Sequence, residues 1–182
     1  MKFDSPLWKL LCLFFENPYE EFYLRELARK AGISVFSAKK FVDEMVKDEM
    51  LIENRKGNMR YFKANLANLF FRHLKISFSL KRIIESGLIE YLKENIPAIS
   101  SITLYGSVAK GEDDKKSDVD LLVIGQKKKV DLSKFEKKIG REIRIIVIKW
   151  AEWRKLAEEN KAFYREIVAS GIALYGEKPV IE

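Results

Sequence analysis

The sequence predicts an α+β protein made of two small domains joined by a helical connector. Three stretches predict this class. The first third places short amphipathic helices ahead of a pair of strand-like segments, residues 65–97 are densely apolar at helical spacing, and the C-terminal half alternates aliphatic strands with helices. We therefore expect one domain at residues 1–64, the connector at 65–97 and a second domain at 98–182.

Composition restricts the class of protein further. The 182 residues are 47% hydrophobic and 34% charged, which is typical of a folded globular chain. The chain shows neither a membrane-length apolar run nor a signal-peptide pattern, so we expect a cytoplasmic protein with no membrane partner. The lone Cys12 cannot form an internal disulfide, and the lone His73 excludes a His-based metal site or triad. The net charge of +7 favours polyanionic partners.

The first third of the chain predicts three helices. Apolar residues at helical spacing predict the first over Ser5–Glu16, ahead of Pro18. The second is expected over Phe22–Ala28. The third is expected from Ser34, as its N-cap, to about Asp48.

Two strand-like segments follow, Leu51–Glu53 and Met59–Lys63, and the turn Arg55–Asn58 between them predicts a β-hairpin. This order of elements, with the stretch YLRELARKAGISVFSAKKFVDEMVKDEMLI, resembles the winged helix-turn-helix domains of small prokaryotic transcriptional regulators. The resemblance implies that the third helix enters the major groove of double-stranded DNA while the hairpin lies along the backbone.

The candidate DNA-contacting residues are polar or basic positions on the outward side of the third helix and on the hairpin: Ser37, Lys39, Lys40, Arg55, Lys56, Arg60 and Lys63. They suit phosphate contacts rather than base reading, because the third helix carries no Arg, Asn or Gln. Winged helices also dock proteins or form dimers, and the acids Asp43, Glu44, Asp48 and Glu49 would repel DNA if they faced it. Protein docking is therefore the alternative for this domain.

The connector, residues 65–97, is apolar on more than one helical face and must be covered on more than one face. We expect it to pack between the domains, in a homodimer interface, or in both places. A cofactor or lipid groove is the less favoured alternative. Ser77, Ser79 and Ser86-Gly87 mark expected helix breaks, and Pro97 ends the segment.

The stretch with the most chemistry is LYGSVAKGEDDKKSDVDLLVI, residues 104–124. An apolar strand breaks at Gly106-Ser107, and a second strand carries Asp118 and Asp120. Strand alternation puts both carboxylates on one side, where they can share a hard cation such as Mg²⁺. Gly106 lets the backbone approach a ligand closely, and the amides from Ser107 onward suit a phosphate. A phosphate-binding turn that faces a metal-binding carboxylate pair is typical of phosphoryl or nucleotidyl transfer.

Gly106-Ser107, Gly111 and Ser117–Asp120, followed by aliphatic residues, together resemble the signature of the DNA polymerase beta-type nucleotidyltransferase superfamily, most closely its minimal nucleotidyltransferases. The resemblance implies a small mixed β-sheet flanked by helices. It also implies that Gly106 and Ser107 bind a nucleoside triphosphate and that Asp118 and Asp120 hold Mg²⁺ or Mn²⁺. Lys110 is a candidate for further phosphate binding from its spacing alone.

The rest of the C-terminal half predicts a helix over Leu132–Ile139, a strand over Glu142–Ile148, helices over Trp150–Asn160 and Ala162–Ser170, and a closing strand at Ile172–Gly176. Active members of the superfamily carry a third carboxylate on the strand after the Asp-x-Asp strand, and Arg144 occupies that position here. Glu142 lies on the same face, about two residues' rise or roughly 6 to 7 Å away. It is the candidate third catalytic residue beside Asp118 and Asp120.

We expect Arg144 to pair with Asp118 or Asp120, leaving nucleotide and Mg²⁺ binding intact and transfer impaired or lost. The leading function is a nucleotidyltransferase-like protein with a DNA-binding winged helix, which, if active, transfers a nucleoside monophosphate to a hydroxyl group. One alternative is a transcriptional regulator whose degenerate domain only senses nucleotide. Another is an antitoxin-like modifier of a helical partner protein.

Overall fold

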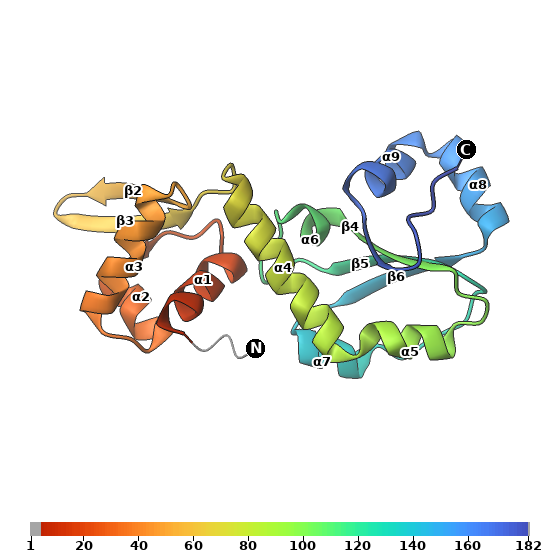
Figure 1. Cartoon of the computed structure of the whole chain (residues 1–182), viewed down its shortest axis with the longest axis horizontal. Helices are drawn as coiled ribbons and strands as arrows, with labels where there is room; N and C mark the ends of the chain where they lie inside the picture. Colours follow the sequence, from red (N-terminus) through yellow and green to blue (C-terminus); the bar gives the residue numbers. More distant parts are fainter. Residues whose placement is uncertain (1–4, 182) are drawn as a thin grey trace. The chain divides into compact units, whose positions relative to one another are not determined.

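The computed structural model describes residues 5–181 and divides into two compact units (Figure 1). Unit 1 comprises Met1–Lys75 and Asp113–Lys115, and unit 2 comprises Ile76–Glu112 and Lys116–Glu182. The division falls inside the long helix α4 (Leu69–Ser86). Within the described residues, no helix has the length and apolar character needed to cross a membrane.

Unit 1 combines three helices with a small antiparallel sheet. Its elements before α4 are α1 (Pro6–Glu16), β1 (Phe22–Tyr23), α2 (Leu24–Ala31), α3 (Val35–Lys47), β2 (Leu51–Lys56) and β3 (Met59–Ala64). The strands lie in the order β1-β3-β2. Apolar faces of the three helices and the strands form its core, with Phe14, Val42 and Phe62 fully buried.

The first helix and the hairpin are confirmed, as is the N-cap of α3, where Ser34 Oγ accepts a hydrogen bond of 3.0 Å from the Ser37 N–H. Two details of the prediction were wrong. Phe22 and Tyr23 form β1 rather than the start of a helix, because their backbone pairs with β3. Arg55 and Lys56 extend β2, since the antiparallel register runs on to Lys56 opposite Met59 and leaves a two-residue turn at Gly57.

The connector also differs in part from the expectation. Helix α4 continues through Ser77 and Ser79, so these residues do not break it, whereas Gly87 (φ 82°) separates it from α5 (Leu88–Asn95). Serine lowers helix propensity only modestly, and the packing of the other side chains of α4 outweighs that cost. Phe71 and Ile83 are fully buried, but Leu69, Phe70 and Ile84 are exposed. The homodimer stays a prediction.

Unit 2 is built on a four-stranded mixed sheet. Its remaining elements are β4 (Ser101–Tyr105), α6 (Gly106–Lys110), β5 (Val119–Ile124), α7 (Ser133–Ile139), β6 (Ile143–Ile148), α8 (Trp150–Glu159), α9 (Lys161–Ser170) and β7 (Ile172–Tyr175). The strand order is β6-β5-β4-β7, with β5 and β6 parallel and the other pairs antiparallel.

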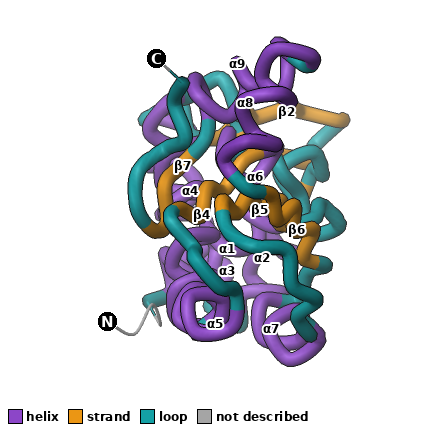
Figure 2. Tube along the Cα trace, turned by 90° about the vertical axis from the view of Figure 1, so that its right-hand side faces the viewer, coloured by secondary structure: helices purple, strands orange, loops and turns teal. Residues whose placement is uncertain are grey.

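Helices cover both faces of this sheet: α5 and α7 lie on one side and α8 and α9 on the other, as two perpendicular views show (Figures 1 and 2). Strand alternation sorts β5 between the two layers. Leu121 and Val123 pack in the core that includes α5 and α7, and Leu122 and Ile124 pack in the core that includes Trp153 of α8. Asp120, being even-numbered, therefore belongs to the α8–α9 face.

One short segment of the nucleotidyltransferase-like motif belongs to unit 1. Asp113–Lys115 lies in sequence between Gly111 and Ser117, yet it packs within unit 1. Lys75 Nζ lies 2.5 Å from Asp113 Oδ1, with 1% and 0% of the two side chains exposed. The Lys115 N–H donates a 2.8 Å hydrogen bond to the Glu16 carbonyl. A buried ion pair thus fixes this segment to the N-terminal unit.

Candidate functional site

The turn after β4 brings the backbone against Asp120. Gly106 opens α6 with φ at +74°, a left-handed conformation that favours glycine. A Cβ added there would lie 2.5 Å from Asp120 Oδ2, closer than any real contact. Gly106 is therefore required twice, for its backbone angle and for the space that Asp120 occupies. Helix α6 has only five residues and ends at Gly111 (φ 69°), so Ser107 lies in its first turn, where backbone N–H groups have no intrahelical partner.

Asp118, Asp120 and Arg144 come together at the start of β5. The parallel register pairs Asp120 with Arg144, and Arg144 Nη2 lies 2.7 Å from Asp118 Oδ2. The predicted pairing of Arg144 with one of the two acids is thereby confirmed, with Asp118 as the partner. Arg144 is 69% exposed, whereas Asp118 is 18% exposed, so the guanidinium covers the carboxylate from the solvent side.

Burial raises the pKa of Asp120 above its ordinary value; Arg144 opposes this rise, and the negative charges of Asp118 and Glu166 add to it. Because the charged form is disfavoured in the folded chain, folding stability is lost as the pH rises through this pKa. The site therefore holds a carboxylate whose negative charge is poorly compensated by the protein.

Replacing Asp120 by asparagine is expected to raise the thermal midpoint at pH 7, because the neutral amide removes the charge that burial disfavours. The gain should disappear below about pH 4, where the carboxyl is protonated in both folded and unfolded chains. Calorimetric melts of both proteins between pH 3 and 7 measure this difference. An unchanged or lower midpoint for Asp120→Asn at pH 7 would contradict the electrostatic account.

Lys110, Tyr105 and Glu166 surround the same end of the sheet. Lys110 of α6 forms an ion pair with Glu166 of α9, so its ammonium group is already neutralised in this conformation. Burial, together with the charges of Asp120 and Glu166, raises the pKa of Tyr105 to about 12. The Tyr105 phenol is consequently neutral at physiological pH. Sequence reasoning missed Glu166, which no motif in the chain marks.

Glu142 is exposed and immediately precedes β6. Its carbonyl accepts a 2.9 Å hydrogen bond from the Val119 N–H, which fixes the backbone beside Asp118. Among residues 5–181, no three His, Cys, Asp or Glu side chains are grouped closely enough to hold a metal ion. The acids whose negative charges act on Asp120 are Asp118 and Glu166.

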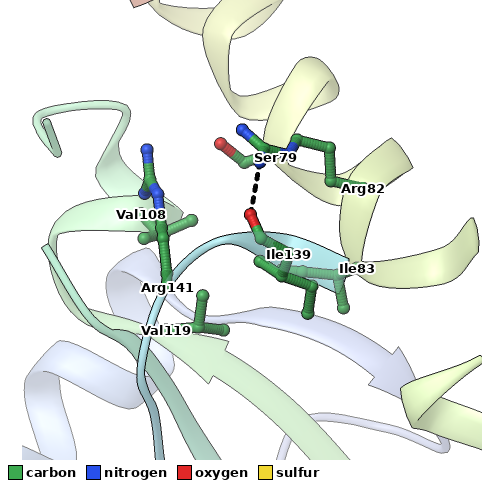
Figure 3. Close-up of a pocket in the computed structure, with 7 residues that line it drawn as sticks. All are labelled: Ser79, Arg82, Ile83, Val108, Val119, Ile139 and Arg141. Atoms are coloured by element: carbon green, nitrogen blue, oxygen red, sulfur yellow. Dashed lines mark hydrogen bonds between the residues drawn. The ribbon is translucent and has the colours of Figure 1, made fainter. Parts of the chain in front are cut away.

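A very small cavity lies behind the site, on the α4–α7 side (Figure 3). Its volume is about 10 Å³, so it has room for one water molecule at most. In Figure 3 a dashed line marks the hydrogen bond from Arg82 to the Ile139 carbonyl, which ties α4 to the end of α7. The lining residues are Ser79, Arg82, Ile83, Val108, Val119, Ile139 and Arg141. This side of β5 is therefore packed, and a nucleotide has no room there.

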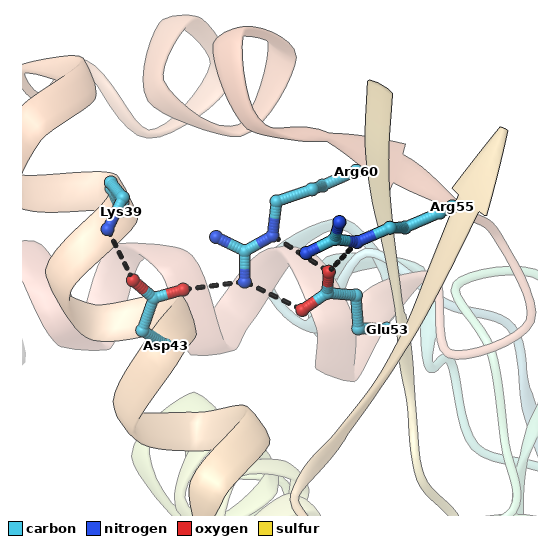
Figure 4. A network of polar contacts seen from close by, with 5 residues as sticks. All are labelled: Lys39, Asp43, Glu53, Arg55 and Arg60. Carbon is cyan, nitrogen blue, oxygen red and sulfur yellow. Dashed lines mark hydrogen bonds and ion pairs between the residues drawn. The ribbon is translucent and has the colours of Figure 1, made fainter. Parts of the chain in front are cut away.

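The candidate DNA-contacting residues form an acid–base network in unit 1 (Figure 4). Arg60 Nη2 lies 2.6 Å from Asp43 Oδ1 and 2.7 Å from Glu53 Oε2. Lys39 Nζ lies 2.8 Å from Asp43 Oδ2, and Arg55 Nε lies 3.3 Å from Glu53 Oε1. These cations are accordingly neutralised by acids of α3 and β2.

The network also lowers the pKa values of its two acids, Asp43 and Glu53. Hydrogen bonds from Lys39 and then Arg60 hold the pKa of Asp43 below its usual value, and those from Arg60 and then Arg55 do the same for Glu53. Both acids are therefore charged at neutral pH, and any anion approaching these cations meets negative charge as well.

The other candidates of unit 1 differ in their surroundings. Lys56 forms an ion pair with Glu21, and Lys63 is half-buried. Lys40 is exposed on α3. The Ser37 hydroxyl lies 2.9 Å from Ser34 Oγ at the N-cap. Lys40 is accordingly the exposed candidate cation of α3 outside the network of Figure 4.

Comparisons with known proteins match this chain to one family and to several solved structures. The family model described as polymerase beta, nucleotidyltransferase matches residues 86–179. No curated protein matches the chain. Several solved structures are similar to it, among them the following three. "Crystal structure of the toxin-antitoxin with AMP-PNP" has 21% identity and a TM-score of 0.38, covering 52% of this chain and 74% of that chain.

A second crystal structure, of a mutant of the toxin-antitoxin MntA-HpeT, has 21% identity and a TM-score of 0.36, covering 52% of this chain and 73% of that one. "Structure of TrmBL2, an archaeal chromatin protein, shows a novel mode of DNA binding" has 12% identity and a TM-score of 0.29, covering 86% of this chain and 70% of that chain. TM-scores this low assign no function. The family model spans more than half of the 182 residues, and the chain therefore belongs to the polymerase beta nucleotidyltransferase family.

Proposed function

We propose that unit 2 binds a nucleoside triphosphate together with Mg²⁺ or Mn²⁺ and does not transfer its nucleotide. Gly106 and Ser107 hold the phosphates, Asp118 and Asp120 hold the metal, and Lys110 adds a positive charge once it leaves Glu166. The observation that carries the proposal is the 2.7 Å ion pair between Arg144 and Asp118. It sets a fixed cation where active members of the family have a carboxylate.

The donor set fits a hard divalent cation. Mg²⁺ is commonly bound by one or two carboxylates with the remaining positions filled by water and substrate phosphates, so the Asp118–Asp120 pair is sufficient. Asp120 is a carboxylate whose pKa is raised by burial and by neighbouring acids, a charge that a cation would stabilise. When bound, the metal would neutralise the developing charge on the phosphates.

Arg144 explains why binding need not lead to transfer. The attacking hydroxyl must lose a proton, and a guanidinium stays protonated and cannot accept one. Glu142 is exposed and lies one position ahead of β6, the strand that carries Arg144. Without an acceptor for that proton, the site retains charge neutralisation and loses the base. A nucleotide sensor is the function that these groups support best.

Equilibrium binding of ATP, GTP, CTP and UTP in the presence of MgCl₂, measured by calorimetry, tests this proposal. Wild-type protein is expected to bind at least one of them, and Asp118→Asn should bind at least tenfold more weakly. Asp131→Asn is the matched control, because Asp131 is exposed on a loop before α7. If no nucleotide binds, or if Asp118→Asn binds as well as Asp131→Asn, the proposal is wrong.

For unit 1 we propose a winged helix-turn-helix that binds double-stranded DNA. The order of α1, α2, α3 and the β2–β3 hairpin supports this, as do Lys40 on α3 and the basic residues of the hairpin. DNA phosphates would take over Arg55, Lys56 and Arg60 from their acidic partners. The acids that pair with these cations therefore compete with the phosphates and lower the affinity for DNA.

A specific observation favours protein docking as the second candidate for unit 1. Phe36 at the start of α3 is 81% exposed and Val35 beside it is 46% exposed. Two adjacent exposed apolar side chains are unusual on a protein surface that contacts only DNA phosphates. A helical partner protein would cover them.

Removing the acid that restrains the hairpin should strengthen DNA binding. Glu53→Gln frees Arg55 and leaves Arg60 paired with Asp43 alone, so we expect tighter binding and a salt dependence steeper by about one released counterion. The Ala variant of Arg55, Lys56 and Arg60 should bind more weakly, with a flatter salt dependence. Fluorescence anisotropy of a labelled duplex between 50 and 300 mM salt measures both. Equal affinity and salt dependence in all three proteins would exclude the hairpin as a DNA contact and favour docking.

A further inference from the structure

A second hollow lies in unit 2 at the far end of β5 from Asp118 and Asp120. Its volume is about 270 Å³, and its lining residues follow the ends of the parallel strands or come from the turn before β4: Ala98, Ile124, Gly125, Gln126, Lys149 and Trp150. Val119 and Ile124 lie five positions apart on β5, a length of about 17 Å. The hollow is therefore distinct from the proposed triphosphate site.

The hollow is fixed by close backbone packing. A Cβ at Gly125 would lie 2.9 Å from Ile96 Cγ2 and 3.3 Å from Ile99 Cα, so the 96–99 turn approaches this strand end as nearly as glycine permits. Ala98 in that turn has φ at +50°, which costs a non-glycine residue about 1 kcal/mol. The Gln126 N–H donates a 2.9 Å hydrogen bond to the Pro97 carbonyl and holds the two segments together.

Trp150 supplies an aromatic surface to the hollow. Its side chain is 41% exposed, and its Nε1–H donates a 3.2 Å hydrogen bond to Ser100 Oγ, which holds the indole in place. Trp153, one turn later on α8, is fully buried and bonded to the Pro179 carbonyl. The core of this face is thus already filled by Trp153, and packing does not account for the exposed indole of Trp150.

Four lysines follow the ends of β5 and β6 at this end of the sheet. Lys127, Lys128 and Lys129 are exposed directly after Gln126, and Lys149 lines the hollow itself. Lys127 Nζ lies 2.9 Å from Glu152 Oε1, and Lys149 also acts on that carboxylate. Glu152 thus interacts with Lys127 and Lys149, while Lys128 and Lys129 add two exposed positive charges next to Lys127 in the chain.

The lysine run leads from the hollow at Trp150 into a neighbouring one. This neighbouring hollow has a volume of about 380 Å³ and is lined by Lys127, Lys128, Lys129, Val130, Ile145 and Val147. Ile145 and Val147 belong to the α5–α7 face of the sheet, whereas Ile124 belongs to the α8–α9 face. The basic surface accordingly extends over the end of the sheet from one face to the other. On each face the hollow is also lined by aliphatic side chains.

We propose that this surface binds single-stranded nucleic acid, with one base stacked on Trp150 and the following phosphates on Lys127, Lys128 and Lys129. An exposed aromatic ring beside a track of cations is the combination by which proteins hold unpaired strands. A duplex hides its base faces, and a single nucleotide would fill only one of the two hollows. The inference stands independently of whether unit 2 binds a triphosphate.

Fluorescence titration tests the proposal in a Trp8→Phe background, where Trp150 is the exposed tryptophan and Trp153 is buried. The probes are a 12-nucleotide single strand of mixed sequence, its duplex and thymidine monophosphate, all with EDTA so that metal-dependent binding at Asp118 is absent. We expect the single strand to quench Trp150 emission. Anisotropy of the same strand, labelled, should show that Trp150→Ala weakens binding about tenfold and that Trp150→Phe retains most of it.

The Lys128→Ala/Lys129→Ala variant should flatten the salt dependence of single-strand binding by about 1.4, two contacts at 0.7 each. Its matched control is Lys137→Ala/Lys155→Ala, which removes the same charge from exposed positions on α7 and α8 and should change nothing. The proposal is overturned if single-strand affinity is the same in Trp150→Ala, if the two lysine variants behave alike, or if thymidine monophosphate or the duplex quenches Trp150 as strongly as the single strand at equal concentration.

Discussion

Replacing Lys75 by methionine is expected to lower the free energy of unfolding by about 3–5 kcal/mol, the cost of leaving a buried carboxylate without its cation. Lys75 and Asp113 have 1% and 0% of their side chains exposed and lie 2.5 Å apart. Water cannot take over the role of the missing ammonium group at such a position. Urea unfolding followed by circular dichroism measures the loss.

The double variant Lys75→Met/Asp113→Leu provides the control. An apolar pair of similar volume removes both charges, so most of the lost stability should return. The same variants bear on the site, because Asp113–Lys115 connects the Gly106 turn to Asp118 along the chain. A loss below about 1 kcal/mol in Lys75→Met would mean that the pair does not hold this segment.

Replacing Gly106 by alanine is expected to reduce the affinity for Mg²⁺-nucleotide at least tenfold. The new methyl group would lie 2.5 Å from Asp120 Oδ2 and would have to displace that carboxylate. The left-handed backbone at Gly106 adds about 1–2 kcal/mol of strain. Calorimetric titration with the nucleotide that binds wild-type protein measures the affinity.

Gly57→Ala separates the two effects. Gly57 has φ at +59° and nothing within 4 Å of an added Cβ, so this variant carries the backbone strain without the clash. We expect both variants to lose stability, Gly106→Ala more because of its clash with Asp120, and only Gly106→Ala to lose nucleotide binding. Equal nucleotide affinity in Gly106→Ala and wild type would show that Asp120 and the Gly106 turn do not act together.

Features that depend on residues close together in the sequence were predictable. Strand alternation places Asp118 and Asp120 on one side of a strand. The resemblance to the superfamily put Arg144 beside them, and the ion pair with Asp118 confirms that pairing. The helix ending at Glu16 and the N-cap Ser34 follow from local hydrogen-bonding chemistry. Such features need no knowledge of the tertiary fold.

Features that depend on tertiary packing were not predictable. Glu166 reaches Lys110 from a helix late in the chain, and Lys56 meets Glu21 only because the hairpin packs near β1. Phe22 and Tyr23 become a strand because β3 lies beside them, although their local pattern favours a helix. The burial of Asp113 with Lys75 likewise required the packing of a loop from the second half of the sequence into unit 1.

Label transfer from α-phosphate-labelled ATP, GTP, CTP and UTP, with Mg²⁺ or Mn²⁺ and a helical protein or nucleic-acid acceptor, tests most directly whether Arg144 stops turnover. Wild type, Asp118→Asn, Glu142→Gln and Arg144→Ala are expected to transfer no label, since none gains a proton acceptor at the position of Arg144. Arg144→Asp supplies one and is expected to transfer label. Transfer by wild-type protein that is abolished in both Asp118→Asn and Glu142→Gln would contradict the sensor account and identify Glu142 as the third catalytic carboxylate.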